Sequence, residues 1–345
     1  MEYNDISIEA AAICEGASIR IEGIHKRLGT VQALDNINLA VDPGTVFALL
    51  GPNGSGKTTL VRILTTLLKP DSGVALVGGY DVVRYAQSVR SVIGLAGQYP
   101  AVEEILTGRE NLEMIGRLYH LGNQNAKARS NELLENFNLL DAANRKVKTY
   151  SGGMRRRLDL AATLVAKPSI LFLDEPTTGL DPRSRIGLWE VITTQTQECN
   201  TVFLTTQYLE EADKLASKIA IIDKGSILRE GTKQELKECC GGDTLVSVRI
   251  ANRNQISIAN SALRELASDT LHSYPDTGEI TLPAGSGTSL LPEVVRRLDA
   301  VDIEIAELAL KPPTLDDVFL SITGHPAEET PDPKYDSSKK PRGNT

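Results

Sequence analysis

The chain has 345 residues, of which 41% are hydrophobic, and a formal net charge of −8 with a pI near 5.2. This length predicts about two domains, and the balanced composition excludes a disordered or fibrous chain. The longest apolar runs are too short to cross a bilayer, and the N-terminus has no basic-then-apolar leader pattern. The acidic balance gives no reason to expect nucleic acid as a partner. We therefore expect a protein that stays in the cytosol.

Strand and helix patterns alternate along the first two thirds of the chain. Apolar runs typical of strands cover residues 18–25, 37–50, 170–174, 201–206 and 218–223. Helical spacing covers residues 57–68 and 183–197. This alternation predicts an α/β fold with a mostly parallel sheet covered by helices.

Composition shifts divide the chain further. Strand signals vanish between about residues 107 and 148, which predicts a helical subdomain, over about 107–166, inserted in a main domain of residues 18–240. After the "CCGGD" break, short strand and helix patterns predict a small C-terminal α/β domain over 241–325. Its "LDDVFL" segment is either a packing helix or a coupling element. Residues 1–17 form an N-terminal extension, and the proline-rich residues 326–345 are expected to be a disordered tail.

A phosphate-binding loop follows the second predicted strand. "GPNGSGKTT" has the P-loop spacing and lies between an apolar strand and a helix, which is the context that the motif requires. Backbone N–H groups of such a loop cradle phosphate oxygens, with help from the helix dipole. Lys57 would contact the β- and γ-phosphates, and the Thr58 hydroxyl would ligate Mg²⁺. The candidate nucleotide-binding residues are Gly51, Pro52, Asn53, Gly54, Ser55, Gly56, Lys57, Thr58 and Thr59.

Two carboxylates close the buried strand "ILFLDEP". Ligands collect at the carboxyl edge of a parallel sheet. Asp174 is therefore a candidate Mg²⁺ ligand, and Glu175 is a candidate base that orients or deprotonates an attacking water.

A second possible anion site opens the helix in "YSGGMRRRLDL". Ser151 is a good N-cap, and the free N–H groups behind it lie at the positive end of the helix dipole. Because one chain already has a phosphate cradle, a second one suggests a site shared between two subunits. The "RRR" at 155–157 reads either as a solvated helix face or as a contact with a partner or lipid head groups.

Taken together, "GPNGSGKTT", Gln98, "SGGMR", "LFLDEPTTGLD" and "TTQYLEEAD" resemble an ATP-binding cassette (ABC) transporter nucleotide-binding subunit in order and spacing, over about residues 18–235. Within that family the chain looks most like the daunorubicin-resistance type, as does its later "PPTLDDVFLSITG". The resemblance implies a P-loop NTPase fold that binds and hydrolyses ATP with Mg²⁺. It also implies a peripheral position on the cytoplasmic face of the cell membrane, docked on a separate permease.

The resemblance further implies a head-to-tail dimer with two ATP molecules between the cassettes. Ser151, Gly152 and Gly153 would then contact the γ-phosphate of the partner's nucleotide. Gln98 would reach Mg²⁺ or the attacking water and link the site to the region that faces the permease. Asp181 would join the two sites across the dimer.

Two positions depart from the common family pattern. Gln207 stands where most relatives have a histidine, so it can donate a neutral hydrogen bond to the γ-phosphate but carries no titratable proton. Leu28 stands where an aromatic residue usually stacks on adenine, and Tyr3 and Tyr80 are candidate substitutes.

The favoured function is an energy-coupling ATPase of an exporter of hydrophobic drugs or lipids. One alternative is a soluble cassette protein that acts on nucleic acid or ribosomes, although this chain has one cassette and no coiled-coil insertion. A third is a nucleotide-gated binding module with little hydrolysis. Glu175 argues against that module, whereas Gln207 and Leu28 are compatible with it.

Overall fold

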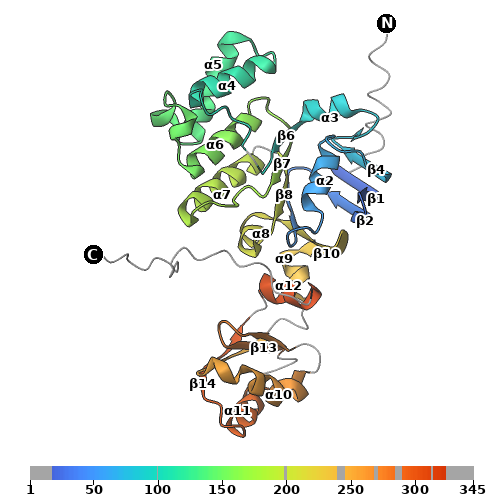
Figure 1. The fold of residues 1–345 in the computed structure, drawn as a ribbon, viewed down its shortest axis with the longest axis vertical. Coiled ribbons are helices and arrows are strands. Elements are labelled where there is room, and N and C mark those ends of the chain that lie inside the picture. The colour runs from blue at the N-terminus through green and yellow to red at the C-terminus, as the bar shows by residue number, and fades with distance from the viewer. Residues whose placement is uncertain are drawn as a thin grey trace, which may run out of the picture.

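The computed structural model describes residues 18–98, 100–197, 200–238, 245–267, 271–283, 290–311 and 314–323. Its largest sheet has six strands in the order β10-β9-β3-β8-β7-β6 (Figure 1). Strands β9 and β10 pair antiparallel and the other neighbours pair parallel, which confirms the mostly parallel sheet. The strands are β3 (Val46–Leu50), β6 (Ile93–Ala96), β7 (Ile170–Asp174), β8 (Thr201–Thr206), β9 (Lys218–Asp223) and β10 (Ser226–Thr232).

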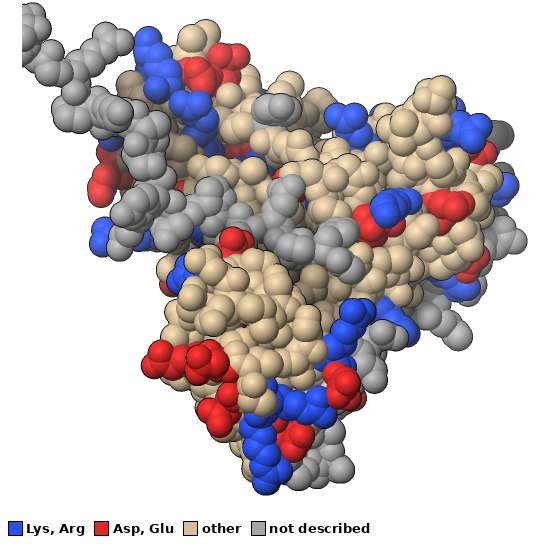
Figure 2. Space-filling view, turned by 60° about the horizontal axis from the view of Figure 1, so that its bottom comes forward, with Lys and Arg blue, Asp and Glu red and all other residues tan. Residues whose placement is uncertain are grey.

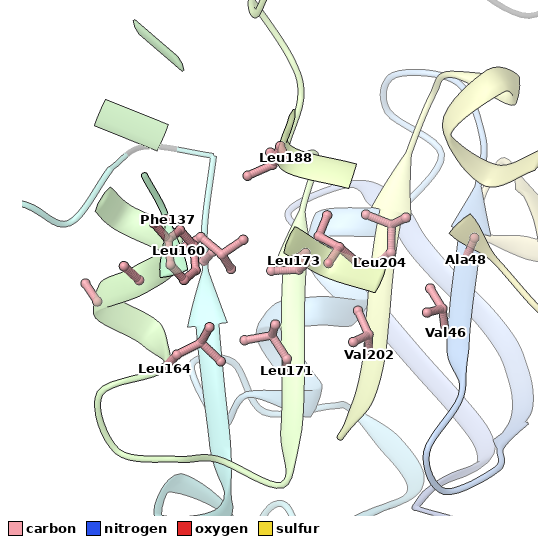
Figure 3. Close-up of a cluster of buried hydrophobic side chains, with 14 of the residues drawn as sticks. Val46, Ala48, Phe137, Leu160, Leu164, Leu171, Leu173, Leu188, Val202 and Leu204 are labelled. Carbon is pink, nitrogen blue, oxygen red and sulfur yellow. The ribbon is translucent and has the colours of Figure 1, made fainter. Parts of the chain in front are cut away.

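The central strands of this sheet are buried on both faces. Every residue of β3, β7 and β8 is buried, as expected of parallel strands covered by other layers. Side chains alternate between two apolar clusters, with Val46 and Ala48 in one and Phe47 and Leu49 in the other. Figure 3 shows the first cluster, which side chains of β3, β7 and β8 share with Leu160 of helix α6 (Gly152–Thr163).

The second cluster lies between the large sheet and a separate antiparallel sheet of four strands, ordered β2-β1-β4-β5. Helix α2 (Lys57–Leu64) contributes four buried apolar residues to it. The strands and the neighbouring helix are β1 (Ile19–Leu28), β2 (Val31–Val41), β4 (Ser72–Val77), β5 (Tyr80–Asp81) and α3 (Ala86–Val92). The sequence placed residues 18–25 and 37–50 in the parallel sheet. In the structure a turn at residues 42–45 ends β2, and only β3 enters that sheet.

The segment between β6 and β7 is helical, and its described residues contain no named strand. It consists of α4 (Gly108–Leu118), α5 (Gly122–Asn136) and α6, together with two short 3-10 turns, Leu140–Ala142 and Val147–Thr149. Thr107 begins α4 with a reciprocal capping box to Glu110. Figure 1 shows this segment beyond the β6 edge of the sheet.

Three further helices complete this part of the chain: α7 (Pro182–Gln197), α8 (Leu209–Leu215) and α9 (Lys233–Glu238). Within the described ranges, no helix is both long enough and apolar enough to cross a membrane. The predicted extension at 1–17, which includes Tyr3, and the predicted tail at 326–345 lie outside the described residues.

The C-terminal residues build a third sheet, of four antiparallel strands ordered β12-β13-β11-β14, with its own apolar cluster. Its elements are β11 (Leu245–Ile250), the 3-10 turn Arg253–Gln255, α10 (Ile256–Ala267), β12 (His272–Tyr274), β13 (Glu279–Pro283), α11 (Leu290–Asp299) and β14 (Ile305–Lys311). The last helix, α12 (Leu315–Thr323), instead packs Leu315, Val318 and Phe319 into the cluster of α8 and α9.

Candidate nucleotide-binding site

The candidate site lies along the carboxyl edge of the large sheet. Strands β3, β8, β7 and β6 are parallel neighbours, and their ends lead into Gly51, Gln207, Glu175 and the Gln98 segment respectively. The backbone N–H of Gly51 donates to the carbonyl of Thr206, so the P-loop and Gln207 begin side by side. The sheet thus assembles at one edge the groups that the sequence predicted for nucleotide binding.

The P-loop has space only for glycine at two positions. A Cβ atom at Gly51 would lie 2.2 Å from the carbonyl oxygen of Ile222. Gly56, the residue before α2, has φ +108°, and a Cβ atom there would lie 2.5 Å from the carbonyl oxygen of Ala33. Between them Ser55 is buried, and its Oγ has no hydrogen-bond partner among the described residues. A phosphate oxygen in the loop would satisfy this hydroxyl, so the residues fit a nucleotide.

Lys57 opens α2 and points back along the loop. Its Nζ donates to the carbonyls of Gly51 at 2.7 Å and Pro52 at 3.0 Å, and lies 3.2 Å from Glu175 Oε1. The Lys57 side chain is 4% exposed and that of Glu175 is 10% exposed. The structure therefore holds the predicted phosphate ligand and the predicted base within ion-pair distance.

An oxygen-rich group beside Lys57 fits Mg²⁺. Thr58 Oγ1 donates to Asp174 Oδ1 at 3.2 Å and accepts from Gln98 Nε2 at 3.0 Å. Thr205 Oγ1, which the sequence did not single out, also donates to Asp174 Oδ1, at 2.6 Å. In the described chain no three His, Cys, Asp or Glu residues form a metal cluster. A single carboxylate with a hydroxyl and an amide suits Mg²⁺, which takes its remaining ligands from water and phosphate.

Glu175 has the left-handed backbone conformation, with φ +48°. Such a backbone is uncommon for a residue other than glycine and needs support from its surroundings. Its N–H donates to both the carbonyl and the Oγ1 of Thr205, at 3.1 Å each, and its Oε2 accepts from Thr178 at 3.3 Å. Thr205 thus hydrogen-bonds to both acidic residues of the site. One feature of the sequence indicated this role, namely that the apolar strand 201–206 ends in polar residues.

Gln207 is buried, and its Oε1 has no hydrogen-bond partner among the described residues. An amide oxygen in that state is suited to a ligand or an ordered water. Leu28 is 47% exposed at the end of β1, in the hairpin that leads into β2. Tyr80, the one proposed aromatic substitute that is described, packs partly buried against the α2-side cluster.

Residues 151–153, here called the Ser151 turn, lie at the start of α6 and not at the P-loop. Ser151 Oγ caps α6 by accepting from the N–H of Met154 at 3.2 Å. A Cβ atom at Gly153 would lie 2.3 Å from Ser184 Oγ, and Ser184 in turn donates to Asp181 Oδ2 at 2.6 Å. Helices α2 and α6 belong to the clusters on opposite faces of the large sheet (Figure 1).

The middle residue of the "RRR" cluster is buried, whereas Arg155 and Arg157 are partly exposed. Arg156 is buried and bonded to backbone carbonyls, Arg155 pairs with Glu104 at 2.9 Å, and Arg157 donates to the carbonyl of Phe137 at 3.0 Å. For Arg156, both the solvated-face interpretation and the partner-or-lipid interpretation were wrong. Local sequence could not reveal this, because its carbonyl partners Gly97 and Pro176 lie in the segments that follow β6 and β7.

Comparisons with known proteins agree with this geometry. The ABC transporter family model matches residues 34–178. The daunorubicin resistance ATP-binding protein DrrA2 of Streptomyces coeruleorubidus is 50% identical over 316 residues, covering 92% of this chain and 98% of that protein. The doxorubicin resistance ATP-binding protein DrrA of Mycobacterium tuberculosis is 45% identical over 315 residues, covering 90% and 95%. A dimeric ATP-binding cassette solved in a post-hydrolysis state with ADP and phosphate is 25% identical with a TM-score of 0.57, covering 62% of this chain and 98% of that one. The chain therefore belongs to the ABC transporter family, as an ATP-binding subunit that hydrolyses ATP.

Proposed function

We propose that this chain drives the export of hydrophobic drugs or lipids through a separate membrane permease, to which it binds on the cytoplasmic face of the membrane. The cargo class is supported by relatives named for resistance to daunorubicin and doxorubicin. Closure of two cassettes around ATP would move the permease, and hydrolysis would reset it.

The proposal that two copies act together is supported by the separation of the two candidate phosphate-binding groups, the P-loop and the Ser151 turn, within one chain. Lys57 and the P-loop lie at the start of α2, whereas the Ser151 turn starts α6 on the other face of the sheet. Ser151 and Gly152 are exposed, so a second copy can reach them. A head-to-tail dimer would place the turn of each copy against the nucleotide of the other, with Asp181 near both.

Within each copy the residues have separate tasks. Lys57 and the loop N–H groups would bind the phosphates, and Ser55 Oγ, which has no partner in the part of the chain that the structure describes, would donate to one of them. Thr58, Asp174 and Gln98 would hold Mg²⁺, which supplies neutralisation of charge on the transferred phosphoryl group. Pro52, Asn53, Gly54 and Thr59 complete the loop around the nucleotide.

For hydrolysis, Glu175 would orient or deprotonate the attacking water. In the structure it is paired with Lys57, so it becomes available when the lysine turns to phosphate. Gln207 would donate a hydrogen bond from its amide Nε2 to a γ-phosphate oxygen without exchanging a proton. Its Oε1, unpaired among the described residues, would accept from an ordered water.

One face of the molecule does not have the charge pattern that a nucleic-acid-binding surface requires. On the face in Figure 2, the basic and acidic residues of the described chain lie interspersed in small groups around a large uncharged area. A nucleic-acid groove requires a concentrated basic surface instead.

A membrane pull-down tests the exporter proposal. A tagged Glu175→Gln chain, incubated with Mg²⁺-ATP and membranes of the source cell, should recover a membrane protein with several spans. Lys57→Ala, which cannot retain the nucleotide, is the matched control and should recover much less. Recovery of the bait alone from both samples would contradict the proposal.

A further inference from the structure

Arg156 and Asp159 form a buried ion pair that the nucleotide-binding motifs do not account for. They lie three residues apart on α6, with Arg156 Nη1 and Asp159 Oδ2 3.2 Å apart. Arg156 is 7% exposed and Asp159 is 1% exposed. A charged pair this deep requires hydrogen bonds to offset its lost hydration, and the partners that supply them show what the pair holds.

The guanidinium of Arg156 joins α6 to the ends of two neighbouring strands. Its Nε donates to the carbonyl of Pro176 at 2.8 Å, and its Nη1 donates to the carbonyl of Gly97 at 2.6 Å. Its Nη2 lies 3.4 Å from the carbonyl oxygen of Asp174 and 3.5 Å from that of Glu175. One planar group therefore contacts the turn that carries Glu175 and the residue before Gln98.

Asp159 holds the other side of the Gln98 segment. Its Oδ1 accepts from the N–H of Ala101 at 2.6 Å. Gly97 and Ala101 flank Gln98, so the ion pair fixes the backbone on both sides of it. Gln98 then donates to Thr58, the candidate Mg²⁺ ligand.

The same helix begins at the Ser151 turn, which the proposed function assigns to the partner's nucleotide. The ion pair therefore connects groups that belong to the two different sites of a dimer. Gln98 and Glu175 act on the nucleotide of this chain, whereas Ser151 and Gly153 act on the other one.

We infer that Arg156 and Asp159 are positioning residues for ATP hydrolysis, which hold Gln98, Glu175 and the Ser151 turn as one unit so that both nucleotides respond to the same movement. This role rests on the proposed function. Arg156 acts through its fork of donors, which a lysine cannot reproduce because an ammonium group is a point charge.

Burial lowers the pKa of Arg156 and raises the pKa of Asp159, in both cases because desolvation disfavours the charged form. Each charge opposes this shift in its partner, and the N–H of Ala101 also lowers the pKa of Asp159. Asp174 and Glu211 also favour the charged form of Arg156, so loss of the Asp159 charge would weaken the compensation of that charge without removing it.

Steady-state kinetics of Arg156→Lys tests the inference. The kcat should fall by about 10- to 100-fold, since small displacements of reacting groups have effects of that size. The KM for ATP should stay within about twofold, because the P-loop contacts are untouched. Arg157→Lys is the matched control and should retain wild-type kcat, since the Arg157 guanidinium donates to the carbonyl of Phe137, in the helical segment away from Gln98 and Glu175.

Asp159→Asn provides a second, nearly isosteric variant in case Arg156→Lys folds poorly. It should also lower kcat, and hydrogen–deuterium exchange at Ala101 should become faster. The kcat of the double variant should be little lower than that of the more impaired single variant, because the effects of substitutions at residues that act as a unit are not additive.

Three outcomes separate the possibilities. Wild-type kcat in both variants, with only a lower Tm, would overturn the inference and leave the proposed function intact. Equal losses in kcat and in ATP affinity would also overturn it, because they indicate general support of the fold. A wild-type chain that neither binds nor hydrolyses ATP would refute the proposed function, and the inference with it.

Discussion

Gln207 makes a direct prediction about pH at the scale of single residues. An amide has no titratable proton, so kcat of the wild-type chain should show no step near pH 6.5. Gln207→His should introduce one, because histidine has an unperturbed pKa of about 6.5. The measurement is kcat against pH for both proteins. A wild-type step near that pH which the substitution leaves unchanged would assign proton transfer to a different group.

Glu175 should be required for hydrolysis but not for nucleotide affinity. Glu175→Gln removes the base and should lower kcat by about 10²- to 10⁴-fold, as general-base losses do. It also removes the carboxylate that pairs with Lys57 at 3.2 Å, so ATP affinity should be maintained or increased. Titration with a fluorescent ATP analogue and single-turnover kinetics would check both effects. Unchanged single-turnover rates would exclude Glu175 as the base.

Glu211 predicts a pH dependence of stability. It is fully buried, and the indole Nε1–H of Trp189 donates to its Oε1 at 3.1 Å. Desolvation raises its pKa above the ordinary value of 4.5, although hydrogen bonds and Arg185 oppose the shift. Because the folded state holds this proton more tightly, the contribution to stability is present at low pH and is lost as pH rises above 4.5 toward the folded pKa.

The comparison with Glu211→Gln isolates this effect, since glutamine keeps an oxygen for Trp189 but does not titrate. The free energy of unfolding of the wild type, minus that of the variant, should fall by up to about 1.4 kcal/mol per pH unit across that window. Urea unfolding at several pH values would measure it. A difference independent of pH would show that the carboxyl is not shifted.

At the scale of elements, the P-loop depends on its glycines for different reasons. Gly56→Ala meets both a left-handed backbone and the carbonyl of Ala33, and should cost about 1–3 kcal/mol of stability. Gly54→Ala has a similar backbone, with φ +80°, but a Cβ atom there meets nothing within 4 Å. Thermal unfolding should therefore show a larger loss for Gly56→Ala. Equal losses of stability in the two variants would mean that the close contact between Gly56 and Ala33 of β2 does not constrain the loop.

Elements with strong local signals were predictable from sequence. The apolar runs of β3, β7 and β8 identified the sheet, and the Gly-Lys-Thr spacing identified the P-loop. Both patterns are formed by residues that are adjacent in the sequence. Pairing partners were not predictable in the same way. Residues 18–25 read correctly as a strand, but their antiparallel pairing with β2 and β4 is set by tertiary packing against α2.

The same limit applies within the site. Asp174, Glu175 and Gln207 were identified because each ends a buried strand. Thr205 and Arg156 were missed because their importance arises from contacts with distant segments. Three consecutive arginines are interpreted as a charged surface unless the carbonyl groups that accept from Arg156 are known.

At the scale of the whole molecule, α12 ties the C-terminal sheet to the cassette. Phe319 is buried in the cluster shared with α8 and α9. Asp317 on the same helix accepts from Tyr274 Oη at 2.8 Å, at the end of β12 in the third sheet. The "LDDVFL" segment is therefore a packing helix between two parts of this chain, and whether it also couples to a partner stays a prediction.

Phe319→Ala should destabilise the protein by about 3–5 kcal/mol, the usual cost of removing a buried phenyl ring. Leu310→Ala on β14, which is 38% exposed, is the control and should have a much smaller effect. Chemical denaturation measures both changes. A loss for Phe319→Ala no larger than that of the control would show that α12 does not anchor the two parts.

The central claim is that ATP is held between the P-loop of one copy and the Ser151 turn of the other, and the mass of the ATP-bound Glu175→Gln chain in solution tests it most directly. Analytical ultracentrifugation with Mg²⁺-ATP should give twice the monomer mass of 37.3 kDa, and with ADP the monomer mass. Adding Ser151→Arg should leave ATP binding intact but keep the chain monomeric. An ATP-saturated Glu175→Gln chain that stays at the monomer mass would contradict the claim.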